Sequence, residues 1–312
     1  MINHWVLLSA YIVTFLIGLP ANILAIYAFI RKLIQSPTPT DVLLLNLTTS
    51  DILFLLFLPL KMYEAASGLQ WHLPQILCSI TSFMFFTTIY TSALLLMAIS
   101  IDRYLGVAFP IAYRKFRKLL YAIAGSVFIW LFSGAHCTIV FFTVHLSEEN
   151  NSTVPKTTCY ENFTESQSRI VLPVRLEFFV VLCLVPLLVC VFCYLSCIWI
   201  LYTRPRITKE KKQRAIGMAA GTLSVFLMCF LPYNISHAVG YGFNQSPQWR
   251  YYTLLLSTFN TCLDPIIFYF SSSTYRNTTK LSLWKLLSFR RQKDTNTTTS
   301  KDTEADSHDV IT

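Results

Sequence analysis

The chain has 312 residues, of which 54% are hydrophobic and 13% are charged, and its net charge at pH 7 is +9. Soluble proteins average about 45–50% apolar and about 25% charged residues, so this composition excludes an ordinary soluble domain and indicates a protein of the bilayer. A basic balance can also mark nucleic-acid binding, but here the basic residues are divided among short segments between apolar runs.

Seven apolar runs are long enough to cross about 30 Å of hydrocarbon as helices. In chain order they cover residues 5–30, 42–60, 76–101, 119–144, 178–203, 215–239 and 251–273. The second and seventh runs each contain one carboxylate, Asp51 and Asp264, and the others contain no charge. The first run has the alternative of a secretory signal sequence. No basic residue precedes it and Arg31 and Lys32 follow it, so we expect it to be retained.

Basic residues gather on one side of the predicted bundle. Of the 25 Lys and Arg residues, 20 follow the first, third, fifth and seventh runs. Cytoplasmic segments collect Lys and Arg, which predicts a multi-pass plasma-membrane protein with an extracellular N-terminus. The positive net charge is thus explained by the orientation of the chain in the membrane, and no nucleic-acid partner is expected.

The short connections predict one all-α membrane protein, a seven-transmembrane helix bundle. After the seventh span, Leu283, Trp284 and Leu287 share a helical face bordered by basic residues, which indicates a short amphipathic membrane-surface helix. We therefore assign residues 1–293 to the bundle with this helix, and residues 294–312 to a disordered, Ser/Thr-rich cytoplasmic tail. No inverted pair of interrupted helices is visible, which disfavours a transporter.

Most of the nine cysteines fall inside the predicted spans, where buried thiols are the usual interpretation. Cys78, at the outer end of the third run, and Cys159, in the long outer loop, remain; both lie on the predicted oxidising side, so we expect a disulfide between them. Asn151 and Asn162 begin Asn-x-Ser/Thr patterns in the same outer loop and are candidate glycosylation sites.

Asn22, Asp51 and Asp264 lie near the middle of their predicted spans, where polar side chains are costly and mark function. Paired carboxylates can indicate an intramembrane aspartyl protease, but Asp264 lacks the Gly-x-Gly-Asp context of that class. Two buried carboxylates need a counter-charge or must neutralise, so we favour a shared sodium ion or proton and expect no other metal. The candidate sodium site consists of Asp51, Ser92, Asn260 and Asp264.

Landmarks in every predicted span, in chain order, resemble the rhodopsin-like (class A) G-protein-coupled receptors. They are Asn22, Asp51, Cys78, Asp102-Arg103-Tyr104, Trp130, Pro186, Tyr194, Cys229-Phe-Leu-Pro232 and Asp264-Pro-Ile-Ile-Phe268. The family usually has Trp at Phe230, Asn at Asp264 and Tyr at Phe268. With no lysine in the seventh span, a retinal-based light sensor is excluded.

The resemblance implies a receptor rather than an enzyme, with no cofactor beyond the possible sodium ion. Its partners are expected to be a heterotrimeric G protein of the inhibitory or phospholipase-activating class and, through a phosphorylated tail at Thr297, Thr298, Thr299 and Ser300, arrestin. An unmodified, solvated tail is the alternative. The residues expected to serve activation and coupling are Asp102, Arg103, Tyr104, Tyr194, Phe230, Pro232, Asp264 and Pro265.

Cationic and imidazole side chains gather at the predicted outer ends of the spans. Arg175 opens the fifth span, Arg250 opens the seventh, His237 follows Pro232 in the sixth, and His136 lies inside the fourth. Long cationic side chains often snorkel to the interface, but His136 is too short to do so. The fork of arginine matches a carboxylate, so we favour an anion site.

Around these residues the sequence is similar to the free fatty acid receptors, and within them to the short-chain branch, receptors 2 and 3. The matching segments are residues 136–140, 159–164, 172–177, 232–241 and 268–273. The resemblance implies activation by acetate, propionate or butyrate, with Arg175 and Arg250 on the carboxylate and Glu161 restraining them when no ligand is bound. It completes the polar pocket with His136, His237, Tyr90, Tyr233 and Asn234, and Phe86 departs from the tyrosine expected at its place.

Two rival functions stay open at this stage. One is a receptor for another small anionic metabolite, such as a hydroxy acid or a nucleotide, and the other is a monocarboxylate transporter. Dose responses to acetate, propionate, lactate and ATP distinguish the first rival from a short-chain fatty acid receptor. A measurement of acetate uptake distinguishes the second.

Overall fold

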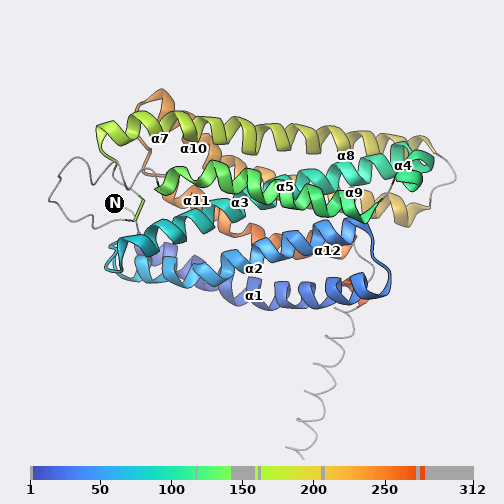
Figure 1. The fold of residues 1–312 in the computed structure, drawn as a ribbon, viewed down its shortest axis with the longest axis horizontal. Helices are drawn as coiled ribbons and strands as arrows, with labels where there is room; N and C mark the ends of the chain where they lie inside the picture. Colours follow the sequence, from blue (N-terminus) through green and yellow to red (C-terminus); the bar gives the residue numbers. More distant parts are fainter. Residues whose placement is uncertain are drawn as a thin grey trace, which may run out of the picture.

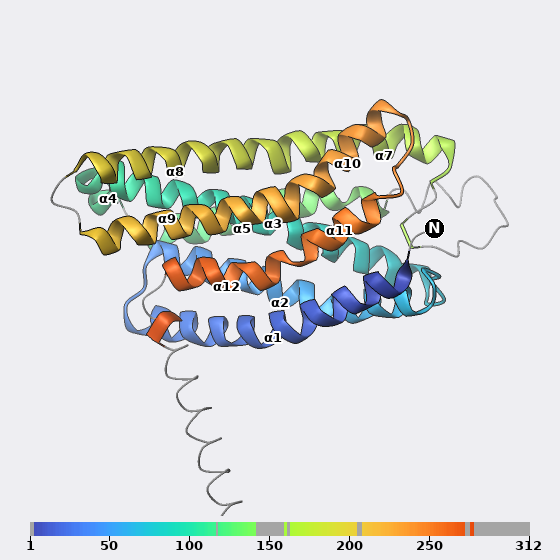
Figure 2. The same cartoon turned by 180° about the vertical axis from the view of Figure 1, so that it is seen from behind.

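The structure is a computed structural model, which describes residues 3–116, 118–141, 159–160, 163–204, 208–271 and 275–277. These residues form a helical bundle whose long helices run along one axis (Figures 1 and 2). Several predictions concern residues outside the described ranges: Glu161, Asn151, Asn162, the surface helix after the seventh span, and the tail.

The first four spans are α1 (His4–Gln35), α2 (Pro39–Ala66), α3 (Gln75–Ala108) and α5 (Leu119–Cys137), with a short α4 (Pro110–Phe116) between the last two. The fifth span comprises α7 (Glu165–Glu177), the π-helical η1 (Phe178–Leu184) and α8 (Val185–Thr203). The sixth comprises α9 (Lys209–Ser224), the π-helical η2 (Val225–Phe230) and α10 (Leu231–Gly242), and the seventh α11 (Arg250–Thr258) and α12 (Asn260–Ser271).

Among the described residues, six continuous helices are long and apolar enough to cross a membrane. The seventh span is interrupted at Phe259, so that neither α11 nor α12 is long enough alone. Together they extend about 33 Å at 1.5 Å per residue, which covers the hydrocarbon thickness. The predicted seven-helix bundle is therefore confirmed, with a break that the sequence did not indicate.

The fifth span begins earlier than predicted. Thr164 and Gln167 form a capping box, in which each side chain bonds the backbone N–H of the other residue, and α7 starts at Glu165. Two consequences correct the sequence analysis. The long outer connection ends before Glu165, and Arg175 lies in the last turn of α7 rather than at the opening of the span.

Two prolines of the predicted spans follow π-helical segments. η1 ends two residues before Pro186, and η2 ends two residues before Pro232. Proline lacks an N–H and crowds the carbonyl of the preceding turn, and a wider turn before it accommodates both effects. Pro20, Pro59 and Pro265 lie within α1, α2 and α12.

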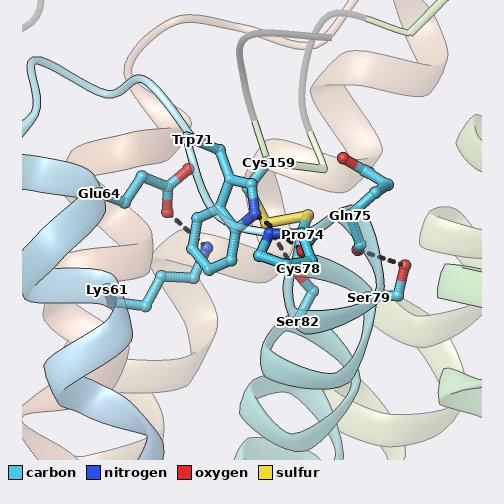
Figure 3. Close-up of a disulfide and its surroundings, with 9 residues drawn as sticks. All are labelled: Lys61, Glu64, Trp71, Pro74, Gln75, Cys78, Ser79, Ser82 and Cys159. Carbon is cyan, nitrogen blue, oxygen red and sulfur yellow. Dashed lines mark hydrogen bonds and ion pairs between the residues drawn. A yellow bond between two sulfur atoms is a disulfide. The ribbon is translucent and has the colours of Figure 1, made fainter.

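The predicted disulfide joins Cys78, near the start of α3, to Cys159, with a Cα–Cα distance of 5.6 Å. Trp71 packs against the bridge and donates its indole N–H to the carbonyl of Pro74 (Figure 3). We call this end of the bundle, with α7 and α11, the disulfide end, and the opposite end the α4 end (Figure 1). The bridge is confirmed, and it holds the segment 159–160 over the disulfide end.

Candidate functional site

Arg175 is buried at the disulfide end, with 4% of its surface exposed. Its Nη1 donates to Oγ of Ser246 at 2.9 Å, and its guanidinium lies over the rings of Phe163 and Tyr160, at 5.0 and 5.7 Å from their centroids. Nη2 is buried without a hydrogen-bond partner among the described residues. Within that part of the chain, no carboxylate lies within 4.0 Å of Arg175. A buried charge of this kind calls for an anion.

Arg250 is the first residue of α11 and has 2% of its surface exposed. Its Nη1 donates to the hydroxyl of Tyr233 at 3.3 Å, and its guanidinium lies 6.0 Å from the centroid of that ring. Arg175 also interacts electrostatically with Tyr233, and both arginines interact with Tyr160. Arg175 thus contacts Tyr160 and Arg250 contacts Tyr233, two tyrosines that line the same cavity, although the arginines come from different spans.

Tyr160 does not neutralise the arginines. Burial raises the pKa of its phenol, although the charges of Arg175 and Arg250 oppose the shift. The ring therefore stays protonated and neutral at physiological pH. Tyr160 therefore contributes an aromatic face to Arg175 but no counter-charge.

Tyr90, Asn234 and His237 form a hydrogen-bonded group beneath the arginines. The hydroxyl of Tyr90 donates to Oδ1 of Asn234 at 3.2 Å and lies 3.3 Å from Nε2 of His237. Asn234 in turn donates from Nδ2 to the carbonyl of Phe230 at 2.9 Å. Nδ1 of His237 is buried and has no partner among the described residues, so it is a further position from which a bound anion can be held.

Arg175, Tyr90 and His237 take part in enclosing a small cavity, which Arg250 and Asn234 adjoin through Tyr233 and Tyr90 without lining it. Its volume is about 10 Å³, close to the minimum that holds one water molecule. Phe86 forms an apolar wall where the resemblance implies a tyrosine, and it stacks on Tyr233 with 6.4 Å between ring centroids. A ligand therefore has to separate side chains that are in contact here. The cavity is lined by Phe86, Tyr90, Tyr160, Arg175, Phe178, Tyr233 and His237.

The structure does not bring His136 into this cavity. It lies in the last turn of α5, not well inside the helix as predicted, and its Nδ1 is 2.7 Å from the carbonyl of Phe132. Nε2 lies 3.1 Å from a carboxylate oxygen of Glu177 on α7. His136 reaches the pocket only indirectly, through a ring contact with Phe178 at 6.2 Å.

The sequence analysis did not identify four residues of this site: Tyr160, Phe163, Phe178 and Ser246. For Tyr160 a signal was present, because it follows Cys159 and the disulfide fixes its place over the bundle. For Ser246, in the connection between α10 and α11, nothing in the sequence points to a contact with Arg175.

A group of buried oxygen atoms lies between α1, α2, α3 and α12. Both carboxylate oxygens of Asp51 and of Asp264, and Oδ1 of Asn22 and of Asn260, have no hydrogen-bond partner among the described residues. The Asp51 and Asp264 carboxyls interact electrostatically. Ser92, the remaining residue of the predicted sodium site, donates to Oγ of Ser50 at 3.1 Å and not to these oxygens. Unsatisfied buried oxygens of this kind fit a monovalent cation or a shared proton. Within the same described ranges, no cluster of three or more His, Cys, Asp or Glu side chains is suited to another metal.

At the α4 end, Arg103 and Tyr194 line one crevice of about 270 Å³ together with Lys211 and Arg214. Tyr194 lies 3.1 Å from the hydroxyl of Thr222, and Tyr104 packs edge-on against Phe109 and Phe192. The two carboxylate oxygens of Asp102 accept hydrogen bonds from Thr40 and Tyr113. Of the predicted coupling residues, Arg103 of α3 and Tyr194 of α8 thus meet at one basic crevice, whose lining does not include Asp102 or Tyr104.

The remaining predicted activation residues lie deeper in the bundle. Phe230 is buried at the end of η2 and packs edge-on against Phe226, with 5.4 Å between ring centroids. Pro232 follows directly in α10. Asp264 and Pro265 are neighbours in α12, and the buried Phe268 contacts Phe29 edge-on at 5.3 Å.

Comparison with known proteins extends the likeness found in the sequence. Residues 21–268 match the family described as 7 transmembrane receptor (rhodopsin family). The chain is 47% identical over 274 residues to free fatty acid receptor 3 of Mus musculus, a match that covers 88% of this chain and 85% of that protein. It is 49% identical to free fatty acid receptor 2 of Rattus norvegicus, over 86% of this chain and 82% of the relative. With free fatty acid receptor 2 of Homo sapiens the identity is 45%, over 97% and 95% of the two chains.

Proposed function

Since the chain belongs to the rhodopsin family of seven-transmembrane receptors, and its relatives are named free fatty acid receptors, we propose that it is a receptor for short-chain carboxylates such as acetate, propionate and butyrate. The family consists of receptors and not of enzymes, as the sequence analysis predicted. The proposed site is the cavity at the disulfide end, and its principal anion-binding groups are Arg175 and Arg250.

The observation that carries the proposal is the buried, incompletely bonded guanidinium of Arg175. Its Nη2 has no partner among the described residues, and the nearby phenols of Tyr160 and Tyr233 are neutral groups. A carboxylate accepts two parallel hydrogen bonds from an arginine, and Arg250 supplies a second cation from another span. The small volume supports a ligand of few atoms.

Ligand binding is coupled to the arrangement of the helices in the bundle. The cavity is nearly filled by its own side chains, so a carboxylate is accommodated only in an arrangement in which they move apart. A ligand that binds one arrangement better than another shifts the population toward it. We expect α10 to pivot at Pro232, because Asn234 and His237 of that helix contact Tyr90 of α3.

The proposed effect of this movement is an opening at the α4 end. There the basic crevice around Arg103 receives a heterotrimeric G protein of the inhibitory or phospholipase-activating class, and the receptor promotes nucleotide exchange on it. We further propose an extracellular N-terminus, arrestin binding to the phosphorylated tail, and a sodium ion among Asp51, Ser92, Asn260 and Asp264. The excess of basic residues on the α4 side of the chain supports the orientation.

The test is guanine-nucleotide exchange on purified G protein in membranes that contain the chain. We expect exchange to rise with acetate and propionate, and radiolabelled acetate not to accumulate in sealed vesicles. A response to lactate or ATP with none to propionate contradicts the ligand class. Acetate uptake without exchange contradicts the receptor function.

A further inference from the structure

A second cavity lies at the α4 end, far from the carboxylate site in sequence and in position. It has a volume of about 520 Å³ and is bounded by α2, α3, α4 and α5. Apart from Asp102, Tyr113, Lys118 and Tyr121, its lining carries no polar side chain. The lining residues Leu105, Phe109 and Tyr121 are exposed on the outside of the bundle, so the cavity opens sideways, toward the position of the bilayer.

Apolar walls alone do not select a ligand here. Lipid tails are as apolar as leucine, so the hydrophobic effect does not favour the cavity over the surrounding bilayer. Selection has to come from shape and charge. The cation in the lining is Lys118, which is exposed and caps the start of α5, and Arg114 and Lys115 are exposed on the adjacent α4.

The one acidic residue of the lining, Asp102, directs its carboxylate toward neighbouring hydroxyl groups. Both carboxylate oxygens of Asp102 accept hydrogen bonds, from the hydroxyls of Thr40 and Tyr113. Lys118 is left facing the lipid side with two further cations near it. With the proposed orientation, the α4 end lies in the cytoplasmic leaflet, which carries the anionic phospholipids.

We propose that this cavity holds one acyl chain of an anionic phospholipid, whose phosphate pairs with Lys118. The bound lipid also contacts α4, because Tyr113 lines the cavity while it donates to Asp102. The ring of Tyr113 packs close to Gly106 of α3, where an added Cβ would lie 3.4 Å from it. The lipid therefore stabilises the packing of α4 against α3, next to Arg103.

The chain offers two separate ways to test the site. Gly125 lines the cavity in the wall formed by α5, and a Cβ added there meets no atom within 4 Å. Gly125→Leu therefore places a large side chain at the cavity wall, and Gly125→Ala is the small-volume control. Lys118→Gln removes the cation, Lys118→Arg keeps it, and Lys32→Gln removes a cation at the same end of α1. Size-exclusion chromatography and circular dichroism verify that each variant is folded.

The experiment is native mass spectrometry of the purified full-length chain, incubated with phosphatidylglycerol and phosphatidylcholine of identical acyl chains and without any carboxylate agonist. We expect one retained phosphatidylglycerol and a preference of about fivefold over phosphatidylcholine, the effect of one basic residue near an anionic lipid. Lys118→Gln should abolish the preference, Gly125→Leu should lower retention of both lipids, and the three control variants should behave as the parent.

Unchanged retention in Gly125→Leu, or an unchanged preference in Lys118→Gln, overturns the proposal. Displacement of the phospholipid by equimolar cholesterol or oleic acid overturns it as well, because the cavity then selects a sterol or a free fatty acid. Since no agonist is present, failure of the carboxylate-receptor proposal does not affect the result.

Discussion

The hydroxyl of Tyr90 donates to Oδ1 of Asn234 at 3.2 Å and thereby ties α3 to α10 directly beneath the anion site. The same hydroxyl lies 3.3 Å from Nε2 of His237. All three side chains are almost completely buried. A single phenol thus joins α3, which carries Arg103, to α10, which contains Pro232 near its start.

Tyr90→Phe should lower the thermal midpoint of the purified, ligand-free chain by a few degrees. The substitution keeps the ring but leaves Oδ1 of Asn234 buried and unsatisfied, at a cost of about 1–3 kcal/mol. Thermal unfolding followed by thiol-reactive fluorescence measures the change. Tyr27→Phe, which removes an exposed hydroxyl, is the matched control, and equal midpoints for Tyr90→Phe and the parent would show that the tie contributes nothing.

Arg175→Ala and Arg250→Ala should each abolish the exchange response to propionate at normal surface expression. Loss of one partner of a desolvated charge pair costs about 2–5 kcal/mol, which is a loss of about 30-fold or more in affinity. Dose–response curves with antibody-measured surface levels check this. Arg169→Ala, at an exposed arginine of α7, is the control, and a normal curve for either buried arginine variant contradicts the site.

Cys78→Ser and Cys159→Ser should cause matching losses of surface delivery, because each removes the same bond across 81 residues of chain. Native disulfides contribute about 2–5 kcal/mol. Flow cytometry of the two single variants and the double variant measures the loss, with the half-buried free thiol Cys262→Ser as control. Strongly unequal single variants, or a double variant much worse than either, would argue against a shared bond.

Asp51→Asn should reduce the effect of sodium on propionate potency. The variant removes one of two interacting carboxylates whose oxygens lack partners among the described residues, and with it the charge that holds a cation. Potency is compared in sodium and in an equal concentration of choline. Glu210→Gln removes an exposed carboxylate of α9 as control; identical sodium effects in Asp51→Asn and the parent exclude the cation from this group.

Potency should rise with chain length from acetate to acids of about three to five carbons and then fall, with acids of twelve carbons inactive. A limit near −1.5 kcal/mol per non-hydrogen atom holds acetate to about −6 kcal/mol, or tens of micromolar. Each buried methylene adds about −0.8 kcal/mol until it meets the Tyr90, Asn234 and His237 group. A sub-micromolar response to a long-chain acid, with none to propionate, would place the chain outside the short-chain branch.

The seven spans were predictable because apolar runs of this length have few alternatives to a membrane helix. The disulfide was predictable because only Cys78, at the outer end of the third run, and Cys159, in the outer loop, lie on the predicted oxidising side. The start of α7 was not predicted, although Thr164 and Gln167 show the spacing of a capping box, because residues 165–177 are mostly polar. The break at Phe259 has no local cause in the sequence, since Pro265 lies six residues further on.

The residues of the candidate site that stand out by their charge were predictable from the sequence. The residues that belong to it because of a contact with a distant residue were not. Arg175 and Arg250 are rare cations at the ends of apolar spans, and the structure places each beside a tyrosine that lines the cavity. His136 had the same signal, but Glu177 holds it at the α5 and α7 contact, a pairing between distant residues that no periodicity reveals. Ser246 is a loop residue whose contact with Arg175 depends on how α10 and α11 are joined.

The π-helical segments η1 and η2 divide the fifth and sixth spans into halves with different helical registers. A π turn holds one more residue than an α turn, because its hydrogen bonds reach from i to i+5, while each residue of an α-helix adds about 100° of rotation. A helical wheel drawn through Arg175 therefore misplaces Tyr194, and one drawn through Met218 misplaces His237. The outer and inner faces of these spans have to be aligned separately, and an insertion or deletion within η1 or η2 turns one face without disturbing the other.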